Sequence, residues 1–210
     1  MVDAAAPAAA MSAVDPERTA LKEWAVLVDA MARGEIWAMV RKGGIREQRA
    51  GFAVRHERFL LYPTFFHETT REVAPRFRDR LDAVHARTPP SGMLRLEHLA
   101  EAAAVWSVGE LDPLRRIDMT HGLDWSAVES RFRYRDRPGV QVVAVRVRRL
   151  PRVVEVPDTR RYGGCVSWVE LDDDVDVSGA APVLPGDVLA ERVAALREVL
   201  GPPRAPDAAP

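Results

Sequence analysis

Residues 36–68, with the sequence IWAMVRKGGIREQRAGFAVRHERFLLYPTFFHE, decide both the fold and the candidate site. The apolar runs at 36–40 and 59–62 are short and rich in large side chains, which is typical of buried strands. Between them, Gly43 and Gly44 supply the backbone freedom that a turn requires. We therefore predict two core strands joined by a glycine-containing turn.

The turn is strongly basic. Backbone N–H groups of a turn, combined with guanidinium groups, suit a phosphate or a carboxylate. We therefore predict an anion-binding site here, completed by side chains at the end of the second strand: Arg41, Lys42, Gly43, Gly44, Arg46, Tyr62 and His67. The alternative interpretation is a solvated hairpin tip whose charges only keep a sheet edge soluble.

The chain has 210 residues, 47% of them hydrophobic, so it can bury a core without a disulfide or a metal. We predict one α+β domain over residues 14–200, between Ala/Pro-rich tails at 1–13 and 201–210 that we expect to be disordered. A net charge of −1 gives no overall attraction to nucleic acid or membrane. No apolar stretch approaches the ~20 residues of a membrane span, and no signal peptide is evident, so we predict a cytoplasmic protein.

Charge is unevenly distributed along the chain. Residues 41–87 hold 11 Lys or Arg against 6 Asp or Glu, and residues 131–161 hold 10 against 3. Residues 170–191 hold 7 acidic residues and no Lys or Arg. The two basic segments can form one anion-binding face, with Arg146, Arg148 and Arg149 as its second half, or the acidic segment can neutralise them internally. The pattern leaves both arrangements open.

Periodicity predicts the other elements in outline. Apolar residues at helical spacing after Pro16 predict a helix over residues 16–34. Alternating valines predict a strand at 140–150, with a further strand at 153–156. Asp124 is placed to cap a helix. The run at 94–104 alternates like a strand at first and then favours helix, and we predict the strand.

Four strings together resemble a known family: ALKEWAVLV from Ala20, RKGGIRE from Arg41, FLLYPTFFHE from Phe59 and YGGCVSWVEL from Tyr162. The chain is similar to a bacterial family of domains of unknown function, number eighteen-zero-two. The resemblance implies no defined chemistry, but some relatives are joined to a restriction-endonuclease-type domain, which implies a restriction or defence context. The segment HGLDW at 121–125 departs from the family pattern, so no role for Trp125 is carried over.

The layout also resembles PUA-like barrels, which include RNA-binding ASCH-type and modified-base-reading EVE-type domains. In those domains a helix ends in Gly, a strand follows and a basic residue closes it. Gly34, residues 36–40 and Arg41 fit that order, whereas Ile36 and Met39 replace the Lys and Glu of the ASCH pattern. We therefore expect an α+β fold with either a mixed, mostly antiparallel sheet or a PUA-like β-barrel, with flanking helices.

Catalytic chemistry has weaker support. The five histidines show no metal-ligand spacing, and we predict neither a metal nor a cofactor. His67 and Glu68 follow a strand end and are candidate acid/base residues, as is Glu23, although neighbours on an extended chain point in opposite directions. Cys165 is the only cysteine, which excludes an internal disulfide and favours a reducing compartment. No base is placed beside Cys165, so we interpret it as a small core residue.

The leading hypothesis is a non-catalytic module that binds nucleic acid or another phosphate-bearing ligand through the basic turn. The alternative is an enzyme acting on a small phosphorylated or nucleotide substrate, with Arg41 and Lys42 as an anion clamp. That alternative predicts a pocket that brings Lys42, His67 and Glu23 together. A third possibility is a scaffold whose basic and acidic segments pair between copies, and the sequence leaves the oligomeric state open.

Overall fold

The computed structural model describes residues 16–42, 56–65, 69–164 and 166–204. Its strands are β1 (Pro16–Trp24), β2 (Ala38–Arg41), β3 (Arg58–Thr64), β4 (Met93–Val108), β5 (Val140–Pro157), β6 (Trp168–Asp176) and β7 (Ala181–Pro182). Its helices are α1 (Ala25–Ala32), α2 (Pro75–Arg78), α3 (Leu81–His85), α4 (Leu111–Arg116), α5 (Trp125–Arg133) and α6 (Gly186–Leu200).

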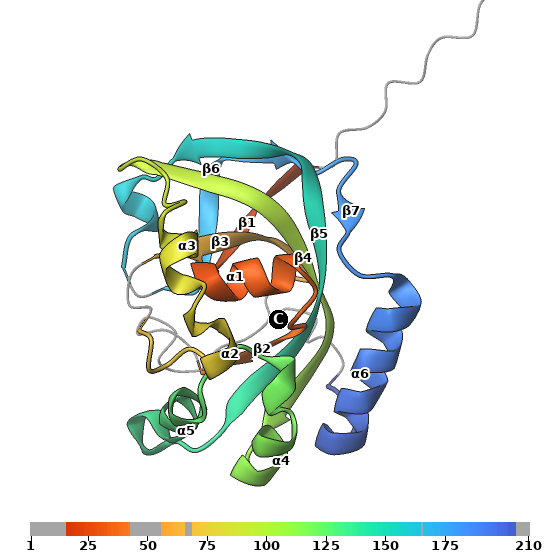
Figure 1. The fold of residues 1–210 in the computed structure, drawn as a ribbon. Helices are drawn as coiled ribbons and strands as arrows, with labels where there is room; N and C mark the ends of the chain where they lie inside the picture. The colour runs from red at the N-terminus through yellow and green to blue at the C-terminus, as the bar shows by residue number, and fades with distance from the viewer. Residues whose placement is uncertain (1–15, 43–55, 66–68, 165, 205–210) are drawn as a thin grey trace, which may run out of the picture.

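The strands form a single sheet in the order β2-β5-β4-β3-β1-β6, with β7 paired to β5 (Figure 1). The pairing of β1 with β3 is parallel, and the other pairings in the sheet are antiparallel. The expected α+β class with a mixed, mostly antiparallel sheet is therefore confirmed. Within the described residues β2 and β6, at the two ends of the order, do not pair, so the sheet is open and the barrel alternative is not the form observed.

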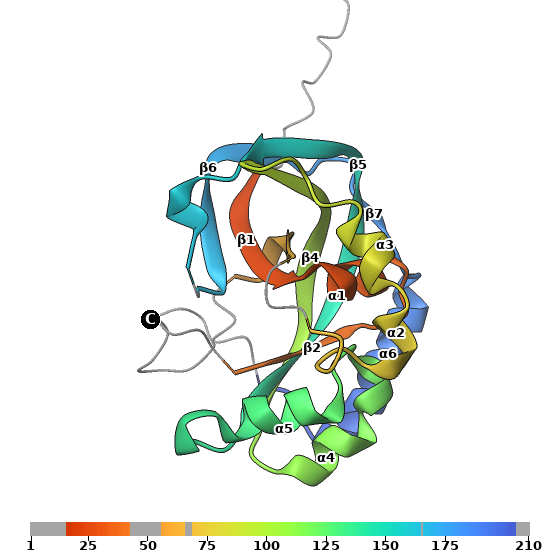
Figure 2. The ribbon, with the colours of Figure 1, turned by 60° about the vertical axis from the view of Figure 1, so that its left-hand side comes forward.

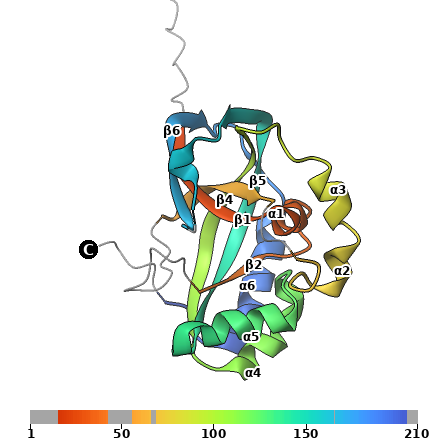
Figure 3. The same cartoon turned by 90° about the vertical axis from the view of Figure 1, so that its left-hand side faces the viewer.

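Two hydrophobic clusters lie on opposite faces of the sheet. Neighbouring residues of a strand point to opposite faces, and accordingly Leu60 of β3 belongs to one cluster and Leu61 to the other. The short helices α1, α2 and α3 gather beside one face, which holds the larger cluster (Figure 3). Long β4 and β5 curl over toward β6 and enclose the smaller cluster (Figure 2).

The predicted helix over residues 16–34 is wrong in its first half. Residues Pro16–Trp24 form β1, between β3 and β6, and only Ala25–Ala32 are helical. Ala20 and Leu21 are both buried, on opposite faces. A strand covered on both faces shows no alternation of apolar and polar residues, so its pattern is easily taken for a helix. Gly34, with φ +68°, ends the turn that follows α1.

The other strand predictions hold with changed boundaries. Residues 94–104 lie within β4, as predicted, and β4 continues to Val108. The strands expected separately at 140–150 and 153–156 are one strand, because β5 runs through Pro151. The pairing of β4 with β5 is irregular opposite this proline, because the register shifts between Leu96 and His98. Proline, which has no N–H to donate, is tolerated where regular strand pairing is interrupted.

No helix in the described ranges has the length and apolar character needed to cross a membrane.

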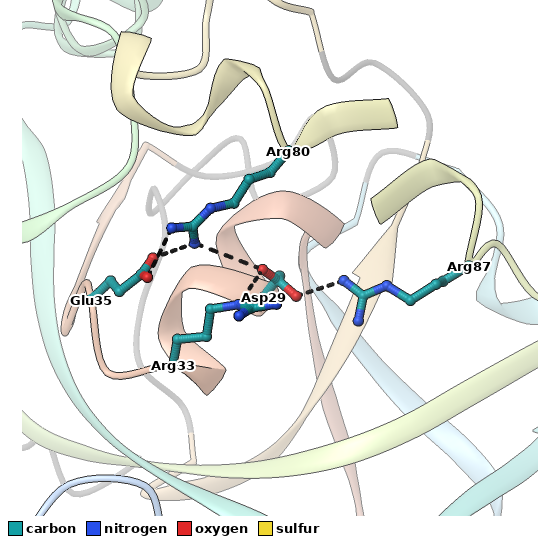
Figure 4. A network of polar contacts seen from close by, with 5 residues as sticks. All are labelled: Asp29, Arg33, Glu35, Arg80 and Arg87. Atoms are coloured by element: carbon teal, nitrogen blue, oxygen red, sulfur yellow. Dashed lines mark hydrogen bonds and ion pairs between the residues drawn. The ribbon is translucent and has the colours of Figure 1, made fainter. Parts of the chain in front are cut away.

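An ion-pair network joins α1 to α3 and its flanks (Figure 4). The Asp29 carboxylate, 9% exposed, accepts from Arg33 Nε at 2.9 Å and from Arg87 Nη2 at 2.5 Å. Arg80 pairs with Glu35 and approaches Asp29 at 4.0 Å. Burial alone would raise the pKa of Asp29, but its hydrogen bonds to Arg33 and Arg87 outweigh burial and hold the pKa below its usual value.

We expect Asp29→Asn to lower the free energy of unfolding by about 1–2 kcal/mol at pH 7, because charge-assisted hydrogen bonds at a buried carboxylate are lost. Urea unfolding measures this change. Since the folded pKa of Asp29 lies below the unfolded 3.8, the difference from wild type should shrink as the pH falls below that value. Glu129→Gln, which removes an exposed pair with Arg133, is the matched control and should cost under about 0.5 kcal/mol. Equal losses in the two variants would contradict the prediction.

Candidate functional site

A cavity of about 770 Å³ lies where the carboxyl ends of the parallel strands β1 and β3 meet the start of α1. We call it the β1/β3 cavity. Lys22 and Tyr62, which both line it, are directly opposite each other in the parallel register. Its far wall comes from the segment before β4 and from the connection between β5 and β6. Its volume is within the range of small-molecule sites, and the carboxyl ends of parallel strands are a common place for them.

Lys22 brings a positive charge to this cavity. Its ammonium donates to the carbonyls of Tyr162 and Gly164, the latter at 3.3 Å, and lies 5.4 Å from the centre of the Tyr62 ring. These contacts fix the ammonium between β1 and the β5–β6 connection. The charge is therefore positioned before any ligand arrives.

A buried ion pair forms the adjoining wall. Arg41 Nη1 lies 2.9 Å from Glu23 Oε2, with 12% and 3% of the two side chains exposed. The same nitrogen donates to the Lys22 carbonyl at 3.1 Å. The other Glu23 oxygen accepts from the Trp24 N–H at 3.0 Å, at the start of α1. A carboxylate there complements the partial positive charge of the helix N-terminus, so Glu23 connects α1 to the Arg41 guanidinium.

Arg131 of α5 supplies a third cation to the lining. Its Nη1 donates to the Val40 carbonyl at 2.8 Å, and its guanidinium carbon lies 4.9 Å from the centre of a Trp24 ring. Burial lowers the pKa of Arg131, and the Glu23 charge opposes that effect. The described lining holds four cations, Lys22, Arg41, Arg131 and Arg160, against the two acids Glu23 and Asp158, so it is net positive.

The Tyr62 side chain is part of the cavity lining and is uncharged at neutral pH, so it is not a candidate base. Its hydroxyl donates to Asp158 Oδ1 at 2.6 Å. Burial, followed by the hydrogen bond and charge of Asp158, raises the pKa of Tyr62. The phenol therefore stays protonated at neutral pH, and its ring offers a flat surface to the cavity.

The family model described as "Domain of unknown function (DUF1802)" matches residues 20–195. The chain belongs to this family. The resemblance noted from four sequence strings is thereby confirmed. Searches of the curated proteins and of the solved structures find no match. The match runs from within β1 into α6, so the β1/β3 cavity of this DUF1802 domain lies entirely within the matched region.

Three of the residues predicted from sequence meet at this cavity of the DUF1802 domain: Glu23, Arg41 and Tyr62. Lys42 is not part of the described lining. Its ammonium donates to the carbonyls of Phe132, Arg137 and Gly139, the first at 3.2 Å and the last at 2.6 Å. Lys42 therefore ties β2 to the connection between α5 and β5. Burial, aided by the charge of Arg137, lowers the pKa of Lys42.

The predicted second half of the basic face lies elsewhere on β5. Arg146 Nη1 and Arg148 Nε pair with the two oxygens of Glu101 on β4, at 3.1 and 3.0 Å. Arg41 instead lies opposite Gln141, near the start of β5. None of Arg146, Arg148 and Arg149 is part of the described lining of the β1/β3 cavity.

The acidic segment pairs with other cations than those of the predicted site. Asp172 pairs with Arg161 at 2.6 Å and Asp174 with Arg18 at 3.5 Å. The following predicted residues lie outside the described part of the chain and stay predictions: Gly43, Gly44, Arg46, His67, Glu68 and Cys165. Among the described residues, no group of three or more His, Cys, Asp or Glu side chains is placed to hold a metal ion.

Sequence reasoning missed Lys22 and Arg131. Lys22 falls in the segment that was expected to be helical, so its alignment with Tyr62 was not foreseen. Arg131 arrives from α5 through tertiary packing against Val40 and Trp24. No local pattern marks either residue.

Proposed function

We propose that this DUF1802 domain binds a phosphate-bearing ligand of nucleotide size in the β1/β3 cavity. The observation that carries the proposal is the grouping of Lys22, Arg41 and Arg131 around one cavity at the start of α1. Ammonium and guanidinium groups are the usual partners of phosphate in proteins. The partial positive charge at a helix N-terminus adds to that preference.

The rest of the cavity suits the ring of a nucleobase. Tyr62 presents an aromatic surface, and Phe65, Pro89 and Leu94 add apolar area to the lining. A ligand pocket of this size typically combines such apolar walls with a few fixed polar groups. The phosphate is expected beside Lys22, and the ring against Tyr62.

A single nucleotide fits these features better than a long stretch of nucleic acid. The chain has a net charge of −1, and Arg146 and Arg148 pair with Glu101 rather than extending the cationic surface of the cavity. Binding along a nucleic-acid backbone depends on many phosphate contacts. A free nucleotide and one nucleotide of a strand share the same chemistry, and the experiment below separates them.

Lys22→Met is expected to weaken nucleotide binding at least 10-fold, because it removes the charge and keeps most of the apolar stem. Calorimetric titration of the four ribonucleoside 5′-monophosphates, of the matching nucleosides and of short single-stranded DNA and RNA at low salt measures this effect. We expect a monophosphate to bind at least 10-fold more tightly than its nucleoside. Preference for an oligonucleotide over every monophosphate would identify a strand as the ligand.

Two variants control for indirect effects. Lys22→Arg keeps the charge and should retain most of the affinity, although Lys22 also holds two backbone carbonyls. Arg133→Gln removes an exposed cation of α5 that is outside the cavity lining and should leave binding unchanged. The proposal fails if wild type binds none of these ligands, or if Lys22→Met binds them as tightly as wild type does.

Ligand binding without catalysis is the function that the described residues support best. Glu23 is occupied by Arg41 and by the Trp24 N–H, and the Tyr62 phenol stays protonated. The enzymatic alternative would depend on His67 or Glu68, which lie outside the described residues. It stays a prediction.

A further inference from the structure

A second cavity, of about 540 Å³, lies beside the first, and we call it the His98 cavity. The two cavities share the lining residues Pro63, Phe65 and Pro89. The His98 cavity opens between α1 and the paired strands β4 and β5. None of the four cations in the described lining of the β1/β3 cavity lines it, so it is a separate candidate site.

The described lining of the His98 cavity has an excess of cations. It includes five arginines against Asp29 and Glu97: Arg33, Arg87, Arg95, Arg149 and Arg152. Asp29 pairs with the first two, and Glu155 pairs with Arg95 at 3.0 Å. Arg149 and Arg152 are exposed and, within the part of the chain that the structure describes, form no side-chain hydrogen bond or ion pair, while Asp176 interacts with Arg152 only through its charge. Two guanidinium groups at this cavity are therefore available for an anion.

A buried imidazole forms part of the same wall. His98 is only 7% exposed, lies opposite Arg149 in the β4–β5 register and lines the cavity. Its Nε2 is inaccessible and has no hydrogen-bond partner among the described residues. The ring therefore contributes a contact surface beside Arg149 rather than a hydrogen bond from Nε2.

His98 is uncharged at neutral pH. Burial, followed by the charge of Arg149, lowers the pKa of His98 to about 4. The ring therefore adds no charge to this wall at pH 7. The remaining wall is apolar and includes Val28, Leu61, Phe65 and Leu150.

We propose that the His98 cavity binds a small organic anion, whose phosphate or carboxylate lies between Arg149 and Arg152, beside the His98 ring. The apolar part of this anion packs against Phe65 and Leu150. The two guanidinium groups supply the charge, and the apolar wall selects for a hydrophobic body. This inference does not depend on the ligand of the β1/β3 cavity.

Titration of the full chain with four probes tests the proposal: phenyl phosphate, benzoate, phenol and inorganic phosphate. Because both charge and apolar contact are required, at least one of the two aromatic anions should bind 10-fold or more tightly than phenol and than inorganic phosphate. Which aromatic anion binds better identifies the preferred acid group. In ¹⁵N-resolved NMR, saturation with that anion should shift the His98 ring nitrogen signals.

The double variant Arg149→Gln, Arg152→Gln should weaken aromatic-anion binding at least 10-fold. Arg133→Gln is the matched control and should bind like wild type, because Arg133 is remote from this lining. Lys22→Met should also bind the aromatic anion normally, which separates this site from the β1/β3 cavity. The proposal is overturned if neither aromatic anion binds, if the double variant retains full affinity, or if Lys22→Met abolishes the binding.

Discussion

Glu23→Gln is expected to lower the free energy of unfolding by about 3 kcal/mol at pH 7. Glu23 and Arg41 form an ion pair at 2.9 Å in which both side chains are almost fully buried. Removing the charge of Glu23 weakens the compensation of the desolvated Arg41 guanidinium. The bond from Arg41 to the Lys22 carbonyl remains, which keeps the loss at the lower end of the usual range for buried pairs.

The double variant Glu23→Gln, Arg41→Met distinguishes a lost ion pair from a packing defect. Removing both charges together should recover more than half of the loss, since no desolvated charge then remains. Glu101→Gln is the control, because Glu101 is a more exposed acid that also pairs with arginine, and it should cost under about 1 kcal/mol. Urea unfolding with unchanged m values measures all three variants. A cost below about 1 kcal/mol for Glu23→Gln would contradict the prediction.

The sequence predicts well those elements whose signals are local. The apolar runs at 36–40 and 59–62 lead directly to β2 and β3, since large side chains in short runs fit a buried sheet. Asp124 caps α5 as predicted, and its Oδ1 accepts from the Ser126 N–H at 3.0 Å. The family resemblance likewise rests on contiguous strings and is confirmed by the family match over residues 20–195.

The first strand could not be predicted in this way. β1 pairs in parallel with β3, which is distant in sequence, and antiparallel with β6, which is more distant still. Both of its faces are covered, so burial follows from tertiary packing rather than from alternation in the sequence. The spacing of apolar residues in 16–24 is equally compatible with a helix, which is why a helix was predicted there.

The candidate site was predicted only in part for the same reason. Arg41 was identified because it flanks the basic turn and Tyr62 because it ends the second strand, and both line the β1/β3 cavity. Lys42 has the same local signal as Arg41, yet its side chain binds three carbonyls near the start of β5. Neighbouring residues at a strand end point to opposite faces. Which of two adjacent cations reaches a cavity is therefore decided by the pairing of the strand.

Acidification from pH 7.5 to pH 5 is expected to lower the free energy of unfolding by about 2 kcal/mol for each of two buried histidines, His98 and His121. Burial and the charge of Arg149 lower the pKa of His98 to about 4. Burial, then the charges of Arg76 and Arg131, lower the pKa of His121 to about 3. His121 is 1% exposed and its Nδ1 accepts from the Leu123 N–H at 3.3 Å, a bond that only the unprotonated nitrogen can make.

The sign of this effect follows from proton uptake. In the unfolded chain both histidines take up protons near their ordinary pKa of 6.5, whereas in the folded chain they stay neutral until the pH is far lower. Stability is therefore complete above pH 6.5 and decreases as the pH falls toward 4. At pH 5 the size of the loss depends on the unfolded pKa alone, because both folded values lie below 5.

Urea unfolding at pH 7.5 and pH 5 measures the loss in wild type and in His98→Leu, which cannot take up a proton at this position. His98→Leu should reduce the pH-dependent loss by about 2 kcal/mol, whatever its stability at pH 7.5. Leu99→Ala is the matched control, because Leu99 is a buried neighbour on β4 without a titratable group. Leu99→Ala should lower the free energy of unfolding by the same amount at both pH values. If His98→Leu loses as much stability on acidification as wild type does, then His98 already binds a proton in the folded protein at pH 5, and its buried imidazole is not neutral there.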